Sequence, residues 1–243
     1  MSLKYLNETI SKLTPHKIDK NFLSSKGVEG ISLRNQEIEC EWKRPTSMQI
    51  IGSYLLRTVC KPVLNVDVGV VIPKSCFQKK DVRDFRYHDK RNLYLGYIAS
   101  AIKEDSQFNE FKFSTFREDR NKVILTFKIT KCNQNSLVLH YHKLIELPFL
   151  TKAELTKNLS SNFVVRIFPL IEPETFPTEG LKINKQNLKD AFRFPFGLGE
   201  EEREFLQVAQ HTPFYNQSVL EDMFMVEHLK QCNQDRDFSC RGT

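Results

Sequence analysis

The sequence predicts a mixed α/β fold, an α+β arrangement in which flanking helices cover one mixed sheet. Short apolar segments with strand periodicity recur along the chain. A valine-rich segment at 65–72 is apolar at both alternating sets of positions, and a segment at 79–103 has helical periodicity without a proline. A chain of 243 residues is long enough to bury one large core.

The composition excludes several classes of protein. Apolar residues make up 40% and charged residues 27% of the chain, as in ordinary globular proteins. Apolar runs such as Val70–Ile72 are far shorter than the roughly 20 residues of a membrane span, and the first residues lack a signal peptide's apolar stretch. We therefore expect a soluble protein that contacts no membrane. Its six scattered cysteines have no zinc-finger spacing and are expected to be free thiols.

The first 46 residues are predicted as an N-terminal helix and strand region. Leucine and isoleucine recur at helical spacing over Leu3–Leu13, which predicts a short helix. Apolar and polar residues alternate from Ile31 to Trp42, which predicts a half-exposed strand and a hairpin about Asn35.

A strand, a tight turn and a helix are predicted next. Met48–Ile51 has the composition of a strand, and Gly52 and Ser53 follow it, with Ser53 as a candidate N-cap of the helix. The valine-rich segment Asn65–Ile72 is predicted as a central strand that is buried on both faces and ends at Pro73.

The segment Lys79–Lys103 gives the clearest helix prediction in the chain, because it has no internal proline, and its first part is basic. Seven basic and three acidic residues lie between Lys74 and Arg91, a local charge of +4 out of a total of +6. Cations along a solvent face can neutralise phosphates, so the candidate RNA-binding residues are Lys74, Lys79, Lys80, Arg83, Arg86, Lys90 and Arg91. The alternative is a solvated helix in which Asp81, Asp84 and Asp89 pair with these cations.

The rest of the chain predicts more strands and a last helix. Strand periodicity recurs at 111–116, 123–129, 137–141 and 163–168. Turn residues at 118–121 predict a hairpin between the first two, and Pro169, Pro173 and Pro177 predict a linker or an edge crossing. His140 and His142 are interpreted as a surface pair. A helix is predicted around Met223–Leu229, with a frayed polar tail at 233–243.

Gly52, Ser53, Asn65 and Asp67 form one candidate site. A Gly-Ser turn at a helix start offers backbone N–H groups and a hydroxyl to phosphate oxygens, and acids two positions apart project from one face of a strand. In nucleotidyl transfer such acids hold two metal ions that neutralise the triphosphate. Asn65 is a neutral amide where the first acid is needed. The sequence therefore predicts a vestigial nucleotide pocket.

The third acid of such a site is also missing. A later strand of the same sheet would have to supply it, but 123–129 and 163–168 contain no acid, and Arg166 is incompatible with a metal cluster. We therefore predict no catalytic residue, no metal and no cofactor. The alternative is an active template-independent nucleotidyltransferase, which requires another acid, such as Glu118 or Asp119, to reach the site.

These residues resemble the first domain of the Nrap family. The resemblance rests on Ile50–Leu56, Asn65–Val68 and Ile72-Pro73, and above all on Lys80-Asp81, Arg86-Tyr87, Lys90-Arg91 and Tyr94-Leu95. It is most specific over 48–102 and continues in order through 164–169 and the last helix. It implies a nucleotidyltransferase-like domain, similar to the palm of poly(A) polymerases, that has lost its catalytic acids.

The resemblance also implies a function and an organisation. The implied role is an RNA-associated scaffold of the small-subunit processome in the nucleolus, supporting pre-rRNA processing and 40S ribosome biogenesis. Implied partners are pre-ribosomal RNA and processome proteins, including the Rrp7-type and casein-kinase subcomplex. The expected organisation is the N-terminal region at 1–46, the nucleotidyltransferase-like Nrap domain 1 at 47–200, and the truncated helical start of a following domain at 201–243. An insert at 131–159 matches no motif. Because family members are several times longer, a truncated isoform with no independent role is an alternative.

Overall fold

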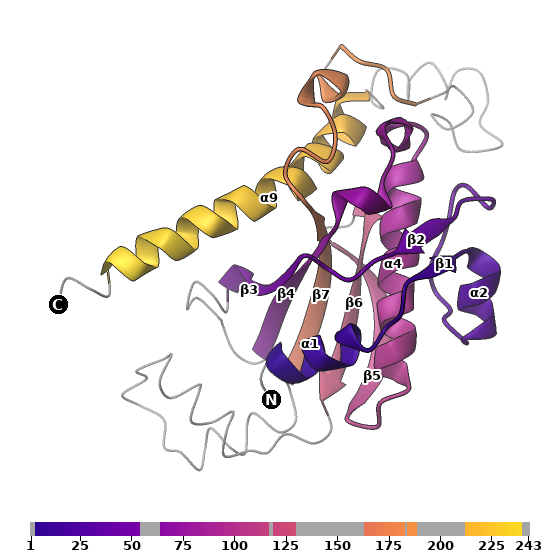
Figure 1. Ribbon diagram of the computed structural model, residues 1–243, viewed down its shortest axis with the longest axis vertical. Coiled ribbons are helices and arrows are strands. Elements are labelled where there is room, and N and C mark those ends of the chain that lie inside the picture. Colours follow the sequence, from indigo (N-terminus) through magenta and orange to yellow (C-terminus); the bar gives the residue numbers. More distant parts are fainter. Residues whose placement is uncertain are drawn as a thin grey trace.

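The computed structural model describes residues 3–53, 64–116, 119–129, 163–182, 184–188 and 212–239. Within these residues, one five-stranded mixed sheet and the helices around it form the body of the molecule (Figure 1). The predicted α/β fold, with a mixed sheet and flanking helices, is confirmed. No helix in this part of the chain is long and apolar enough to cross a membrane.

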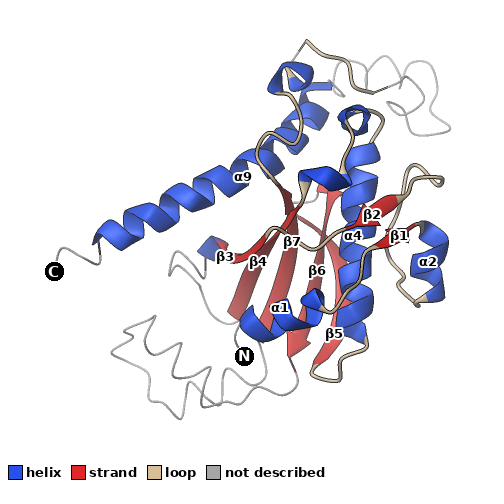
Figure 2. Cartoon of the chain, in the orientation of Figure 1, coloured by secondary structure: helices blue, strands red, loops and turns tan. Residues whose placement is uncertain are grey.

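The large sheet has a single parallel pair of strands at its centre. In spatial order its strands are β3 (Ser47–Ile51), β4 (Leu64–Ile72), β7 (Phe163–Ile171), β6 (Asp119–Ile129) and β5 (Phe108–Phe116), as Figure 2 shows. β4 and β7 run parallel, and the other neighbours are antiparallel. The strand predicted at 65–72 is therefore confirmed as β4, and the hairpin predicted between 111–116 and 123–129 is confirmed as β5 and β6.

The two faces of the sheet are buried by different helices. Val66 and Val68 of β4 belong to the main core, together with Leu93 of α4 (Arg86–Lys103). Val71, which points to the opposite face, clusters with Val226 of α9 (Thr212–Ser239). Burial by α4 on one face and by α9 on the other explains why β4 is apolar at both alternating sets of positions.

The N-terminal region contains a confirmed helix and an incorrectly predicted strand. The elements here are α1 (Leu3–Ser11), β1 (His16–Ile18), α2 (Lys20–Ser25) and β2 (Cys40–Trp42). The strand predicted from Ile31 forms only at β2, which pairs with β1, so the hairpin about Asn35 is wrong. The reason is Asp89 of α4, whose carboxylate accepts hydrogen bonds from the backbone N–H groups of Arg34 (3.0 Å) and Asn35 (2.9 Å). A side chain, not a neighbouring strand, satisfies this backbone.

The uninterrupted helix predicted over Lys79–Lys103 is also wrong. Two 3₁₀ helices, η1 (Lys74–Cys76) and η2 (Lys79–Val82), precede α4. Asp84 and Phe85 separate η2 from α4, and both adopt left-handed backbone conformations, with φ of 53° and 60°. Such angles cannot continue a right-handed helix. The turn buries the Phe85 ring 5.1 Å from the ring of Tyr215 on α9.

Pro169 lies inside β7, although the sequence predicted a linker or crossing at this point. Leu125 of β6 and Ile167 of β7 form the last pair between these strands at this end; Val123 lies two residues before Leu125, and Pro169 lies two residues after Ile167. The buried guanidinium of Arg91 bridges the two strands there, since Nε donates to the Pro169 carbonyl (3.2 Å) and Nη1 donates to the Val123 carbonyl (2.7 Å). Arg91 therefore supplies hydrogen bonds where proline has no N–H to donate.

The C-terminal part of the chain adds η3 (Thr178–Leu181) and α9. The predicted last helix is confirmed, but α9 continues to Ser239, so residues 233–239 of the predicted frayed tail are helical, and 240–243 lie outside the described residues. The strand predicted at 137–141, the histidines His140 and His142, and the insert at 131–159 lie outside the described residues.

Candidate functional site

Gly52 lies directly against the carboxylate of Asp67. The antiparallel pairing of β3 and β4 places Ile51 opposite Asp67, and Gly52 follows with a φ of 66°. A Cβ atom on Gly52 would lie 2.7 Å from Oδ2 of Asp67. Both the backbone conformation and the close approach therefore require glycine. Residues 54–63 lie outside the described residues, so the N-cap role of Ser53 stays a prediction.

Asp67 is engaged by Arg166, its register partner on β7. Parallel pairing of β4 and β7 sets the two residues side by side. Nε of Arg166 donates to Oδ1 of Asp67 at 2.6 Å, and Nη2 donates to Oδ2 at 2.8 Å. Asp67 is 6% exposed. Both oxygens of this carboxylate, the one acid of the predicted vestigial pocket, are thus committed to a bidentate ion pair.

The remaining predicted members of the pocket do not complete a metal site. Asn65 is half-buried two residues before Asp67, and its register partner on β7 is Val164. Asp119 lies at the start of β6, seven residues before Thr126, which pairs with Arg166. At ~3.3 Å per residue, Asp119 is about 20 Å along the strand from this pair. Glu118 is outside the described residues, which contain no group of three acidic, histidine or cysteine side chains able to hold a metal.

Three of the predicted RNA-binding residues are engaged by acids of the fold. Asp81 is fully buried and pairs with Arg86 (Nε–Oδ1, 3.1 Å) and with buried Lys90 (Nζ–Oδ2, 2.7 Å). Arg91 is 2% exposed and pairs with Asp222 of α9 (Nε–Oδ2, 3.2 Å). The predicted solvent face of the helix is wrong for Lys90 and Arg91, because both are buried. Internal pairing, the alternative, is confirmed for Asp81.

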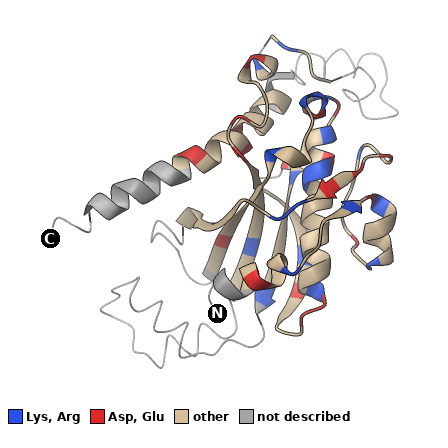
Figure 3. Ribbon diagram, viewed as in Figure 1, with Lys and Arg blue, Asp and Glu red and all other residues tan. Residues whose placement is uncertain are grey.

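The other four predicted cations are exposed. Lys74 lies on η1, Lys79 and Lys80 lie on η2, and Arg83 follows η2. Figure 3 shows Lys and Arg gathered at this end of α4. The structure thus divides the basic segment into cations that stabilise the fold and cations that face solvent.

Three of these exposed cations line a cleft that the sequence did not predict. The cleft has a volume of about 510 Å³ and lies between η2 and the segment at 177–187. Its lining residues are Lys79, Lys80, Val82, Arg83, Pro177, Gly180, Lys185, Gln186 and Asn187. Lys185 is about a hundred residues from the basic segment, and no sequence motif connects the two.

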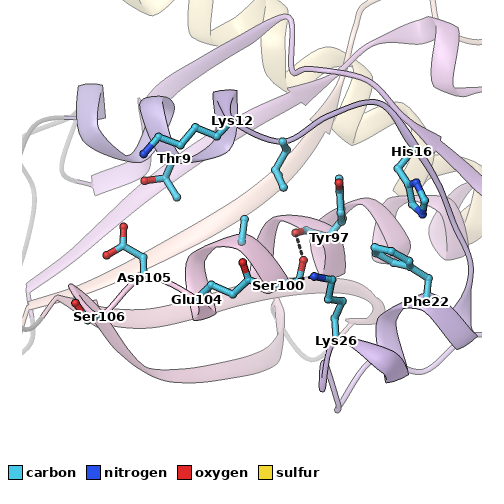
Figure 4. A pocket seen from close by; sticks show the side chains of 12 residues that line it. Thr9, Lys12, His16, Phe22, Lys26, Tyr97, Ser100, Glu104, Asp105 and Ser106 are labelled. Atoms are coloured by element: carbon cyan, nitrogen blue, oxygen red, sulfur yellow. Dashed lines mark hydrogen bonds and ion pairs between the residues drawn. The ribbon is translucent and has the colours of Figure 1, made fainter.

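A second cavity, of about 660 Å³, lies between α1, α2 and α4 and contains none of the predicted site residues. In Figure 4, Lys12, which directly follows α1, faces the end of α4, and His16 and Phe22 close the opposite end. Lys26 pairs with Glu104 at 3.3 Å. The lining of this cavity combines two lysines with two acids, so its charges favour neither anions nor cations as ligands.

The fold and the pocket define a class of protein: a mixed α/β domain in which an Asp–Arg ion pair occupies the polar site of the central strands. A model of the family described as Nrap protein domain 1 matches residues 4–236. The chain therefore belongs to the Nrap family. The matched range crosses both predicted internal boundaries, at 46/47 and at 200/201, which stay predictions.

Proteins named nucleolar protein 6 are similar to the chain. The Xenopus tropicalis protein is 30% identical over 194 residues, which cover 79% of this chain and 14% of the relative. The Homo sapiens protein is 29% identical over 189 residues, which cover 76% of this chain and 14% of the relative. The Mus musculus protein is 40% identical over 73 residues, which cover 30% of this chain and 6% of the relative. The chain thus matches about 14% of the length of the first two relatives. Their name supports the predicted localisation in the nucleus, at the nucleolus, and the placement in a nucleolar ribosome-biogenesis family.

Proposed function

We propose that the chain is a catalytically inactive, nucleotidyltransferase-like scaffold of the small-subunit processome that associates with RNA and supports pre-rRNA processing and 40S ribosome biogenesis. The main observation in support of the proposed loss of catalysis is the bidentate ion pair between Asp67 and Arg166. Family membership and the nucleolar name of the relatives support the setting.

The electrostatics of the Asp67–Arg166 pair oppose metal-dependent nucleotidyl transfer. That reaction requires several carboxylates to hold divalent cations beside the triphosphate. Arg166 instead places a permanent positive charge against Asp67, and Asn65 contributes no negative charge. A divalent cation would have to displace the guanidinium from both carboxylate oxygens and then share the site with it. This arrangement favours a structural role for the polar site.

The partners of the proposed scaffold are pre-ribosomal RNA and processome proteins, among them the Rrp7-type and casein-kinase subcomplex. The exposed cations Lys74, Lys79, Lys80 and Arg83 support an association with RNA, because their side chains face solvent and form no ion pair within the described residues, so they can neutralise phosphates. Lys90 and Arg91 are excluded from this role by their burial.

A primer-extension assay tests the loss of catalysis. The chain is incubated with labelled nucleoside triphosphates, Mg²⁺ or Mn²⁺ and an RNA primer, beside an active poly(A) polymerase. We expect extension with the polymerase alone. Metal-dependent extension by the chain, abolished in the Asp67→Ala variant, would overturn the proposal.

Co-sedimentation tests the scaffold role. A tagged chain is expressed in cells, and the lysate is separated on a sucrose gradient. We expect the chain in the fractions that contain pre-ribosomal RNA. Sedimentation of the chain only as free protein would overturn this part of the proposal and favour a truncated form with no independent role.

A further inference from the structure

We propose that the cleft between η2 and the segment at 177–187 binds the phosphate groups of single-stranded RNA. This inference rests on the proposed RNA association and names its site: Lys79, Lys80 and Arg83 on one wall and Lys185 on the other.

The first wall of the cleft is a short basic segment whose buried acid, Asp81, pairs with other residues of the fold. The carboxylate of Asp81 accepts a hydrogen bond from the backbone N–H of Gln78 (2.8 Å) and pairs with Arg86 and Lys90. These contacts hold η2 against the start of α4. Lys79, Lys80 and Arg83 flank the two buried residues of η2, Asp81 and Val82, and are exposed. The segment therefore presents cations outward while its acid is neutralised inside.

The second wall is held by two buried asparagines. Nδ2 of Asn187 donates to the Gly180 carbonyl and to Oδ1 of Asn216 on α9, both at 2.8 Å. Nδ2 of Asn216 donates in turn to the carbonyls of Lys182 and Lys185, both at 3.0 Å. Asn216 is 1% exposed. This network fixes the backbone that carries Lys185, so the position of this cation is set by the fold.

A backbone hydrogen bond joins the two walls. The N–H of Asp84, which follows the first wall, donates to the carbonyl of Asn187 on the second at 2.9 Å. The left-handed turn at Asp84 and Phe85 directs the chain toward this contact. The cleft is therefore pre-formed, and a ligand need not supply the free energy to assemble it.

The charge of the cleft selects an anion. Its described lining contains four cations and no acid. The nearby Glu179 pairs with Lys182 at 2.6 Å, so its charge is compensated. Cations on two walls of a concave site suit successive phosphates of one strand that enters between them, as in grooves that follow a single-stranded backbone. The exposed ring of Pro177 offers apolar surface to a sugar or base.

Fluorescence anisotropy with a labelled single-stranded oligouridylate tests this site. One variant combines Lys79→Ala, Lys80→Ala, Arg83→Ala and Lys185→Ala. A matched control combines Lys12→Ala, Lys17→Ala, Lys20→Ala and Lys26→Ala, which are exposed lysines of the N-terminal region. Both variants lose four positive charges, so a non-specific charge effect would weaken RNA binding equally in both. Circular dichroism confirms that each variant folds.

We expect the cleft variant to lose at least about tenfold in affinity and the control to bind like the unaltered chain. The slope of log affinity against log salt should become shallower by about 3 in the cleft variant, from ~0.7 for each of four lost phosphate contacts. Lys185→Ala alone should also weaken RNA binding, because Lys185 lies on the second wall. Such a loss would indicate that RNA contacts both walls. Equal losses in both quadruple variants, or tighter binding of polyglutamate than of RNA, would overturn the inference.

The two proposals fail in distinguishable ways. If the cleft variant binds RNA like the unaltered chain, the cleft inference fails, while co-sedimentation with pre-ribosomal particles still supports the scaffold role. If the unaltered chain does not co-sediment, the scaffold proposal fails whatever the purified chain binds.

Discussion

Arg166 on β7 lies in register with Asp67 on β4 and binds both of its carboxylate oxygens, at 2.6 and 2.8 Å. The pair joins the only parallel neighbours among the described strands of the large sheet. Under the proposed loss of catalysis, this guanidinium occupies the place of the cation that a metal-dependent nucleotidyltransferase holds. The positive charge is permanent, because arginine does not deprotonate in proteins.

His88 should make the stability of the fold depend on pH. It is 2% exposed, and burial, followed by the charges of Arg91, Lys122 and Arg34, holds its pKa well below the usual value. Below about pH 6.5 the unfolded chain binds a proton at this position that the folded chain does not. His88 therefore contributes a loss of about 1.4 kcal/mol of unfolding free energy per pH unit below 6.5, until its lowered folded pKa is reached. Urea denaturation between pH 5 and 8 measures this change of the unfolding free energy with pH.

The comparison that isolates this effect is between the unaltered chain and His88→Gln. Burial raises the pKa of Asp89 to about 6, which acts in the opposite direction because it favours the folded state as the pH falls from about 6 toward 4. Asp89 is present in both proteins, so its contribution cancels in the difference. His228→Gln, which changes an exposed histidine of α9, is the matched control. An identical profile for His88→Gln would contradict the prediction.

Asp222 should be essential for the packing of α9 against the sheet. Its buried carboxylate pairs with Arg91 and with Lys122, and it accepts a hydrogen bond from the hydroxyl of Tyr87 at 2.7 Å. Asp222→Ala leaves two buried cations without this partner, and we expect a loss of about 3–5 kcal/mol in unfolding free energy. Chemical denaturation measures this loss. The neighbouring Glu221→Ala removes a half-exposed partner of Lys122 and should cost about 1 kcal/mol or less. Similar losses in both variants would contradict the assignment.

Asn216 should affect RNA binding without contributing any charge. Asn216→Ala removes the donor to the Lys182 and Lys185 carbonyls and the acceptor of the Asn187 side chain. We expect a loss of about 1–3 kcal/mol in stability, because buried polar groups lose their partners. Looser placement of Lys185 should also weaken oligouridylate binding several-fold in the anisotropy assay. The exposed neighbour Gln217→Ala is the matched control. Unchanged affinity in a folded Asn216→Ala variant would show that the second wall does not position the ligand.

Local patterns predicted the elements of the sheet, whereas the sites depend on contacts between distant segments. β4 could be predicted because a strand covered on both faces is apolar at every position. The turn at Asp84 and Phe85 could not, since it forms where Phe85 meets Tyr215, far along the chain. Sequence identified Arg166 as incompatible with metal by its charge alone. Its contact with Asp67, 99 residues away, required the parallel register of two strands.

The basic segment shows the same limit. Charge counting found a local excess of cations, but it could not separate those that neutralise buried acids from those that face solvent. That separation follows from the burial of Asp81 and Asp222. Lys185 escaped prediction because its role depends on a wall held by Asn187 and Asn216.

Replacing the two residues that block the polar site should create metal binding. In the double variant Asn65→Asp, Arg166→Asp, three carboxylates stand at positions 65, 67 and 166. The first two share one face of β4, and the third is the register partner of the second. Without metal, their mutual repulsion should make this variant less stable than the unaltered chain. Mn²⁺ at about 100 times its dissociation constant should then stabilise it by ~2.7 kcal/mol, which thermal unfolding detects as a rise in Tm.

The matched control for this prediction is Asn65→Asp, Arg166→Asn. It removes the guanidinium from Asp67 but supplies one carboxylate fewer, so Mn²⁺ should raise its Tm much less, because a site that holds two divalent cations needs several negative ligands. The unaltered chain should show no rise, since Arg166 engages both oxygens of Asp67. If Mn²⁺ raised the Tm of the unaltered chain as much as that of the Asn65→Asp, Arg166→Asp variant, the metal would be able to displace Arg166 from Asp67. The Asp67–Arg166 contact would then no longer account for the proposed loss of catalysis.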